Sequence, residues 1–91
     1  MARLRFSVVG PIARVDLPGL CDRVSMLLAT SQATTAICDV GTVEADAVTV
    51  EALARLQLAA KRYGCQIRLR RASPDLLDLV EFMGLQDVLA R

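Results

Sequence analysis

The stretch from Ala36 to Arg70 constrains the fold of this chain more than any other part of it. It begins with AICDV, a nearly continuous apolar run that is typical of a strand buried on both faces. An amphipathic helix is predicted next, from about Ala47 to Tyr63, and Gly64 ends it. QIRLR follows and alternates, as in a strand with one exposed face. This order predicts two parallel strands joined by a right-handed crossover.

Two strands and a helix are predicted before this unit. RLRFSVV alternates between polar and apolar residues, Gly10-Pro11 indicates a turn, and PIARV continues as a second short strand of a hairpin. Asp16 is then expected to cap a helix that carries Pro18 in its first turn. After QIRLR, Ser73 and the Pro-Asp pair that follows it predict the start of a last long helix, with a final short turn over LQDVLA.

The predicted order is therefore β-β-α-β-α-β-α. It indicates an α/β fold with a small mixed sheet of about four strands and three to four helices mainly on one face. The alternation predicts that four arginines line the uncovered face, namely Arg3, Arg5, Arg68 and Arg70. A length of 91 residues fits one domain over residues 1–91.

Composition and charge argue against several classes of function. The net charge of +1 favours neither nucleic acid nor a membrane surface, and the face of arginines has no aromatic side chains for stacking bases. No apolar run approaches the roughly 20 residues that span a bilayer, so no membrane insertion is expected. With 54 % apolar and 3 % aromatic residues, the core is predicted to be aliphatic, with Phe6, Tyr63 and Phe82 as its largest members.

The inventory of reactive side chains predicts a protein that is not an enzyme. The chain has no histidine, and its three cysteines, Cys21, Cys38 and Cys65, lack metal-type spacing. Buried free thiols in a reducing, cytoplasmic setting are expected, without a metal or a cofactor. Asp39 and Asp46 are a candidate carboxylate pair, but the end of a strand and the start of a helix give each an ordinary structural role.

Any functional site is expected where the strands end, because the loops at the carboxyl ends of strands gather at one edge of an open α/β sheet. These loops are predicted at residues 16–19, 41–46 and 71–73. Two interpretations of the middle loop remain open. Either Asp46 is a helix cap and Glu44 a solvated acid, or the two form an acidic partner-binding edge with Thr49 as an exposed hydroxyl.

The segments and their order resemble a STAS domain, the fold shared by bacterial anti-sigma-factor antagonists and by cytoplasmic domains of some anion transporters. The segments that carry the resemblance are VVGPIARVDLPGL, ICDVGTVEADAVTVEALARLQLAAKRYG and ASPDLLDLVEFMGLQDVL. It covers nearly the whole chain. It implies a domain that binds a regulatory protein, an anti-sigma factor or a related switch protein.

The resemblance also implies a missing switch. In the family's regulatory members the helix opens with Asp-Ser-Ser-Gly-Leu, and the partner kinase phosphorylates the second serine. The corresponding residues here are Asp46, Ala47, Val48, Thr49 and Val50. Val48 has no hydroxyl, so phosphorylation of that position is excluded. Thr49 remains a weak candidate phosphoacceptor, because the acids around it would repel the added charge.

Three functions are therefore carried forward. The leading one is an interaction module that docks its partner through residues 41–51, with Glu44, Asp46, Ala47, Val48 and Thr49 at the contact. The second is an accessory subunit of an ABC lipid transporter, with the face of arginines near lipid headgroups. The third is a sensor of a small ligand such as a nucleotide, bound at the helix N-terminus beside Arg71.

Overall fold

The computed structural model describes residues 3–85 as a small α/β fold with a three-stranded sheet and three α-helices. The elements are β1 (Arg3–Ser7), the 3-10 helix η1 (Arg14–Asp16), α1 (Leu17–Ser31), β2 (Thr35–Asp39), α2 (Ala47–Arg62), β3 (Gln66–Arg70) and α3 (Pro74–Phe82). The last turn, predicted over LQDVLA, lies outside these residues except for Leu85.

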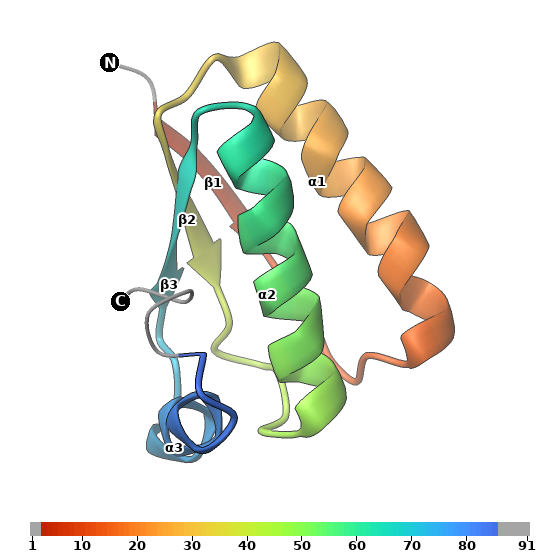
Figure 1. The fold of residues 1–91 in the computed structure, drawn as a ribbon, viewed down its shortest axis with the longest axis vertical. Helices are drawn as coiled ribbons and strands as arrows, with labels where there is room; N and C mark the ends of the chain where they lie inside the picture. Colours follow the sequence, from red (N-terminus) through yellow and green to blue (C-terminus); the bar gives the residue numbers. More distant parts are fainter. Residues whose placement is uncertain (1–2, 86–91) are drawn as a thin grey trace.

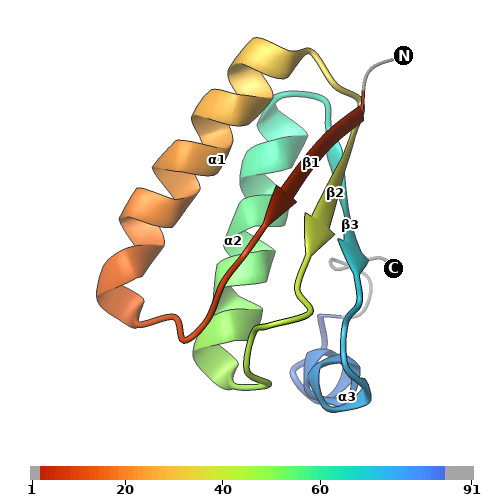
Figure 2. The ribbon, with the colours of Figure 1, turned by 180° about the vertical axis from the view of Figure 1, so that it is seen from behind.

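The sheet is wholly parallel, in the order β1-β2-β3. Arg5 lies beside Ile37, which in turn lies beside Arg68, so β2 is the central strand. The parallel pair predicted between Ala36 and Arg70 is confirmed. Helices α1 and α2 cover one face of the sheet, while α3 lies at the edge where the strands end, close to the beginning of α2 (Figures 1 and 2).

The hairpin predicted at the N-terminus is wrong, since residues 11–15 form no strand. The Ala13 carbonyl accepts a hydrogen bond from the Asp16 N–H at 2.9 Å, and the Asp16 carboxylate accepts one from the Ala13 N–H at 3.2 Å. These local bonds occupy the backbone groups that a strand would offer to a neighbour, and η1 forms instead. Asp16 does not cap α1 through its side chain, although Pro18 stands in the first turn as predicted.

The core between the helices and the sheet is aliphatic, as the composition predicts. Its buried members include Leu53, Leu56 and Ala60 of α2, at the spacing of one helix face. The predicted large members are mostly elsewhere. The Phe82 side chain is 88 % exposed and Tyr63 is 45 % exposed, whereas the half-buried Phe6 packs against the core. Leu and Val residues therefore fill the space that aromatic side chains were expected to fill.

Local signals at the helix ends are confirmed. The Ser73 hydroxyl accepts a hydrogen bond from the Leu76 N–H at 3.1 Å and begins α3. Gly64 and Gly84 follow α2 and α3 with left-handed backbone angles, φ 66° and 74°. Helices α2 and α3 therefore begin and end where short side-chain and glycine signals place them.

The uncovered face of the sheet carries the arginines expected there. Arg3 and Arg5 of β1 and Arg68 and Arg70 of β3 are all exposed. The neighbouring residues of each strand face the helices, because successive side chains point to opposite sides of a strand. This face is therefore positively charged, with the half-buried Ile37 at its centre.

Candidate docking site at the beginning of helix α2

The loop from Gly41 to Asp46 lies at the edge where all three strands end (Figure 1). It passes close to the segment that follows β1. A Cβ atom on Gly10 would lie only 3.2 Å from the Cα of Val43, so the absence of a side chain at Gly10 lets these two backbones approach. The segment that follows β1 therefore packs closely against the loop that carries the candidate site.

Asp46 is the N-cap of α2. Its Oδ1 atom accepts a hydrogen bond from the Thr49 N–H at 2.8 Å, and its carbonyl accepts one from Val50 at 3.1 Å. The capping role considered for Asp46 is confirmed. This carboxylate also stands where an anionic ligand would bind at a helix N-terminus, which argues against a nucleotide at this position.

Thr49 is not an exposed hydroxyl, and that prediction is wrong. The residue is 1 % exposed, and its Oγ1 atom has no hydrogen-bond partner among residues 3–85. The burial of Thr49 could have been predicted from its spacing, because it precedes Leu53 by four residues and therefore lies on the buried face of the helix. The folded chain does not offer this hydroxyl to a kinase.

We expect Thr49→Val to stabilise the domain by about 0.5–2 kcal/mol, because valine has nearly the same shape and removes a buried polar atom that lacks a partner. Urea unfolding followed by circular dichroism measures the change. Thr42→Val, at an exposed loop position, is the matched control and should change stability by less than about 0.5 kcal/mol. A loss of stability in Thr49→Val would show that the hydroxyl makes a hydrogen bond.

The side chains accessible to a partner are those of Glu44 and Ala47, which are exposed, and Val48, which is half-buried. Glu44 makes no ion pair with another residue of the described range. The structure therefore keeps Glu44, Ala47 and Val48 together at the surface, while Asp46 acts on its own helix and Thr49 belongs to the core.

Glu51, one turn further along α2, is held by two arginines. Arg55, four residues later on the same helix, lies 3.7 Å from one carboxylate oxygen, and Arg14 of η1 approaches the other oxygen to 2.6 Å. The contact with Arg14 joins residues 37 positions apart, and no local pattern in the sequence indicates it. It fastens η1 to the beginning of α2 at the side of the candidate site.

Asp39, at the end of β2, also has its carboxylate engaged in hydrogen bonds within the chain. Its Oδ1 atom accepts the Gly41 N–H at 2.9 Å, and the Arg71 Nε lies 3.1 Å from both carboxylate oxygens. The Gly41 hydrogen bond, and then the Arg71 guanidinium, hold the pKa of Asp39 below its usual value. A carboxylate with a lowered pKa is a weaker base, so Asp39 is poorly suited to general base catalysis.

Gly41 makes room for this contact, because a Cβ atom there would lie 2.7 Å from the Arg71 guanidinium carbon. Arg71 is therefore already paired with a carboxylate of its own chain. That pairing is a second argument against the nucleotide sensor, which required this arginine for the phosphates.

The cysteines do not supply reactive thiolates. Burial, followed by the charge of Asp39, raises the pKa of Cys38 to about 12, and burial also raises the pKa of Cys21 and of Cys65. All three are free thiols. Within the described residues, no group of three or more His, Cys, Asp or Glu side chains is arranged to hold a metal ion.

No helix in residues 3–85 has the length and apolar character needed to cross a membrane. Comparison with models of known protein families gives no match, and comparison with curated proteins gives no significant match.

Proposed function

We propose that this chain is a non-enzymatic STAS-like module that docks a regulatory protein, an anti-sigma factor or a related switch protein, through residues 41–51. The parallel unit from β2 to β3 and the Ser73 helix start support the resemblance, while the absence of a strand at residues 11–15 departs from the predicted order. The cytoplasm is part of this proposal, and the three free thiols support a reducing compartment.

The observation that carries the proposal is the surface formed by Glu44, Ala47 and Val48. It lies at the edge where the strands end, it combines an acid that has no ion pair within residues 3–85 with two small apolar side chains, and Asp46 fixes its backbone. Nearby groups that would perform chemistry are engaged elsewhere, Asp39 with Arg71 and Glu51 with Arg14. A fixed surface without reactive groups suits recognition better than catalysis.

The proposal includes the loss of the phosphorylation switch. Val48 occupies the position where the family's regulators carry the phosphorylated serine, and Thr49 is buried. Partner binding would therefore be constitutive, and the amount of the protein would control it.

A charge at Val48 tests the docking site. We expect Val48→Asp to weaken binding to the cognate anti-sigma factor at least about tenfold, which corresponds to about 1.4 kcal/mol, because it places a charge that must lose its water on the half-buried apolar part of the docking surface. An acid in the first turn also favours the helix, so the domain should remain folded. Isothermal titration calorimetry measures the affinity.

Leu58→Asp is the matched control, because Leu58 is 57 % exposed on the same helix but lies away from residues 41–51. It should leave the affinity unchanged within about twofold, since it lies outside the docking surface. Equal affinities for Val48→Asp and the unchanged protein would contradict the docking site. A lack of binding by the unchanged protein to any anti-sigma factor of its organism would contradict the function.

The face of arginines supports a second candidate, the accessory subunit of an ABC lipid transporter. Arg3, Arg5, Arg68 and Arg70 present a positive surface that suits anionic headgroups. Co-purification with an ABC ATPase and its membrane fraction would favour this candidate. A protein found wholly apart from both would exclude it.

A further inference from the structure

The two outer edges of the sheet, β3 and β1, differ in whether a side chain pairs with their outward-facing backbone groups. At β3, the outward-facing peptide group of Ile67 is paired with the side chain of Gln57, which is 3 % exposed. The Ile67 N–H donates to Gln57 Oε1 at 2.9 Å, and Gln57 Nε2 donates to the Ile67 carbonyl at 3.2 Å. The glutamine of α2 therefore takes the place of a neighbouring strand and blocks the middle of this edge.

Among residues 3–85, no side chain covers the edge of β1 in this way. The Val8 N–H donates to the Asp39 carbonyl at 3.0 Å, so Val8, and Phe6 two residues earlier, turn their peptide groups toward β2. Arg5 and Ser7 consequently turn theirs outward. By this alternation neither backbone N–H is directed at β2, and neither makes a turn or loop hydrogen bond with another residue of the described range. Two donors and two acceptors are therefore arranged as one side of a strand ladder.

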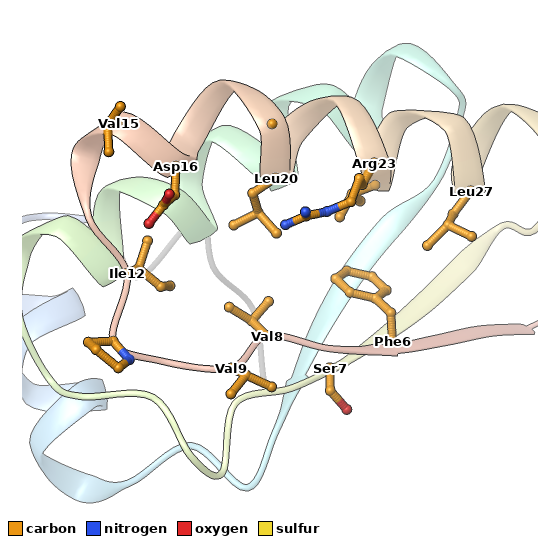
Figure 3. A pocket seen from close by; sticks show the side chains of 13 residues that line it. Phe6, Ser7, Val8, Val9, Ile12, Val15, Asp16, Leu20, Arg23 and Leu27 are labelled. Carbon is orange, nitrogen blue, oxygen red and sulfur yellow. The ribbon is translucent and has the colours of Figure 1, made fainter.

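A groove of about 530 Å³ runs along this edge, between β1 and α1. Figure 3 shows Phe6 and Val8 pointing into it from the strand, with Leu20 and Leu27 pointing in from the helix. Leu27 is 42 % exposed, whereas Val9 is 70 % exposed but points away from the groove, to the same side as Ser7 (Figure 3). An apolar surface therefore lies directly beside unpaired backbone groups, on the helix side of the sheet.

The opposite side of the same strand is positively charged. Arg3 and Arg5 are exposed and make no ion pair within residues 3–85. Arg23 of α1 is among the residues that line the groove, and Asp16 lies at its far end, where it binds the Ala13 N–H. A strand added at this edge would have one row of side chains over the groove and the other row beside Arg3 and Arg5.

The charges select the partner. In an antiparallel pairing with a second copy of β1 centred on Leu4 or Arg5, arginines of the two copies would face each other, and like charges directly opposite each other destabilise a strand pair. The register centred on Phe6 places Arg5 opposite Ser7 but still brings the arginines of both copies to the same face of the sheet. A segment with acidic residues on one side and apolar residues on the other matches both faces. In an extended strand, such a segment has acidic and apolar residues in alternation, because successive side chains point to opposite faces.

We propose that the outer edge of β1 binds an extended, alternating acidic and apolar segment of another protein as a fourth strand of the sheet. This surface is separate from the docking site at residues 41–51, so either site can be present without the other. The main-chain hydrogen bonds of Arg5 and Ser7 would supply affinity. The groove and the arginines would supply selectivity.

The test uses the acetylated and amidated heptapeptide in which four valines alternate with three glutamates, and its counterpart with lysines in place of glutamates. We expect saturable binding of the glutamate peptide with a Kd below about 1 mM, and weaker binding of the lysine peptide by at least about tenfold. The amide signals of Arg5 and Ser7 should shift in NMR spectra and become protected from hydrogen exchange.

Variants of β1 separate the two contributions. Ser7→Pro removes one outward N–H at a position where an edge strand tolerates proline, and should weaken binding about tenfold, whereas Ser7→Ala retains the N–H and should bind normally. Arg5→Glu should reverse the preference in favour of the lysine peptide. This reversal is a gain of binding, which an unfolded variant would not show.

Three results would overturn the proposal. The first is a lack of saturable binding by the glutamate peptide. The second is equal binding of the two peptides by the unchanged protein. The third is a set of shifts confined to residues 41–51, which would place the peptide at the docking site instead of at β1.

Discussion

Gln57→Leu should lower the free energy of unfolding by about 2–4 kcal/mol, although it replaces a polar residue in the core with an apolar one of similar size. The side chain pairs with both polar groups of the Ile67 peptide, and leucine would leave a buried donor and a buried acceptor without partners. Each costs about 1–3 kcal/mol, which exceeds what the added apolar burial returns. Urea unfolding measures the loss.

Gln57→Glu provides a sharper version of this experiment. A protonated glutamic acid can both accept from the Ile67 N–H and donate to the Ile67 carbonyl, whereas a carboxylate can only accept. Burial should raise its folded-state pKa above the unfolded value of about 4.3, so the stability it contributes is present below that pH and is lost as the pH rises through the folded pKa. The deficit relative to the unchanged protein should therefore grow from pH 4 to pH 7. A deficit that does not depend on pH would contradict the pairing.

Leu56→Ala should produce a loss of similar or greater size, about 2–5 kcal/mol. Leu56 is fully buried between α2 and the sheet, and truncation would leave a cavity in a core with few large side chains. Domains of this size are typically stable by about 5–15 kcal/mol, so this single change would remove a large part of the total. The urea midpoint should fall with an unchanged dependence on denaturant.

Leu58→Ala is the control for this prediction, since Leu58 lies two residues away on the same helix but is 57 % exposed. It should cost less than about 1 kcal/mol, because most of its surface already contacts water. Similar losses for the two variants would contradict the assignment of the buried face of α2.

The elements that the sequence predicted well are those in which side-chain pattern and end signals agree. QIRLR became β3 with the predicted bounds, and α2 begins at Ala47 after the Asp46 cap. The exposed arginines followed from the same alternation. The strand expected over residues 11–15 failed because its apolar pattern is short, and the mutual hydrogen bonds of Ala13 and Asp16 form a local alternative.

The candidate site was less predictable, because its contacts join residues far apart in the chain. Nothing local to Arg14 indicates Glu51, and nothing local to Arg71 indicates Asp39. The burial of Thr49 and Gln57 was accessible in principle, since both lie at helical spacing from Leu53, but a polar residue on an apolar stripe is usually assigned to the surface. The role of Gln57 depends on the Ile67 backbone that lies opposite it, which the sequence does not display.

The side chain of Gln57 also bears on how copies of this protein can associate. A parallel sheet with two receptive edges can add β1 of one copy to β3 of the next, and repetition of that contact has no natural end. Here the Ile67 peptide group is already occupied, so such a head-to-tail chain would have to displace a buried glutamine at every junction. The paired Ile67 peptide group therefore opposes addition of a strand at β3, and with it this route to fibres, whereas β1 remains receptive.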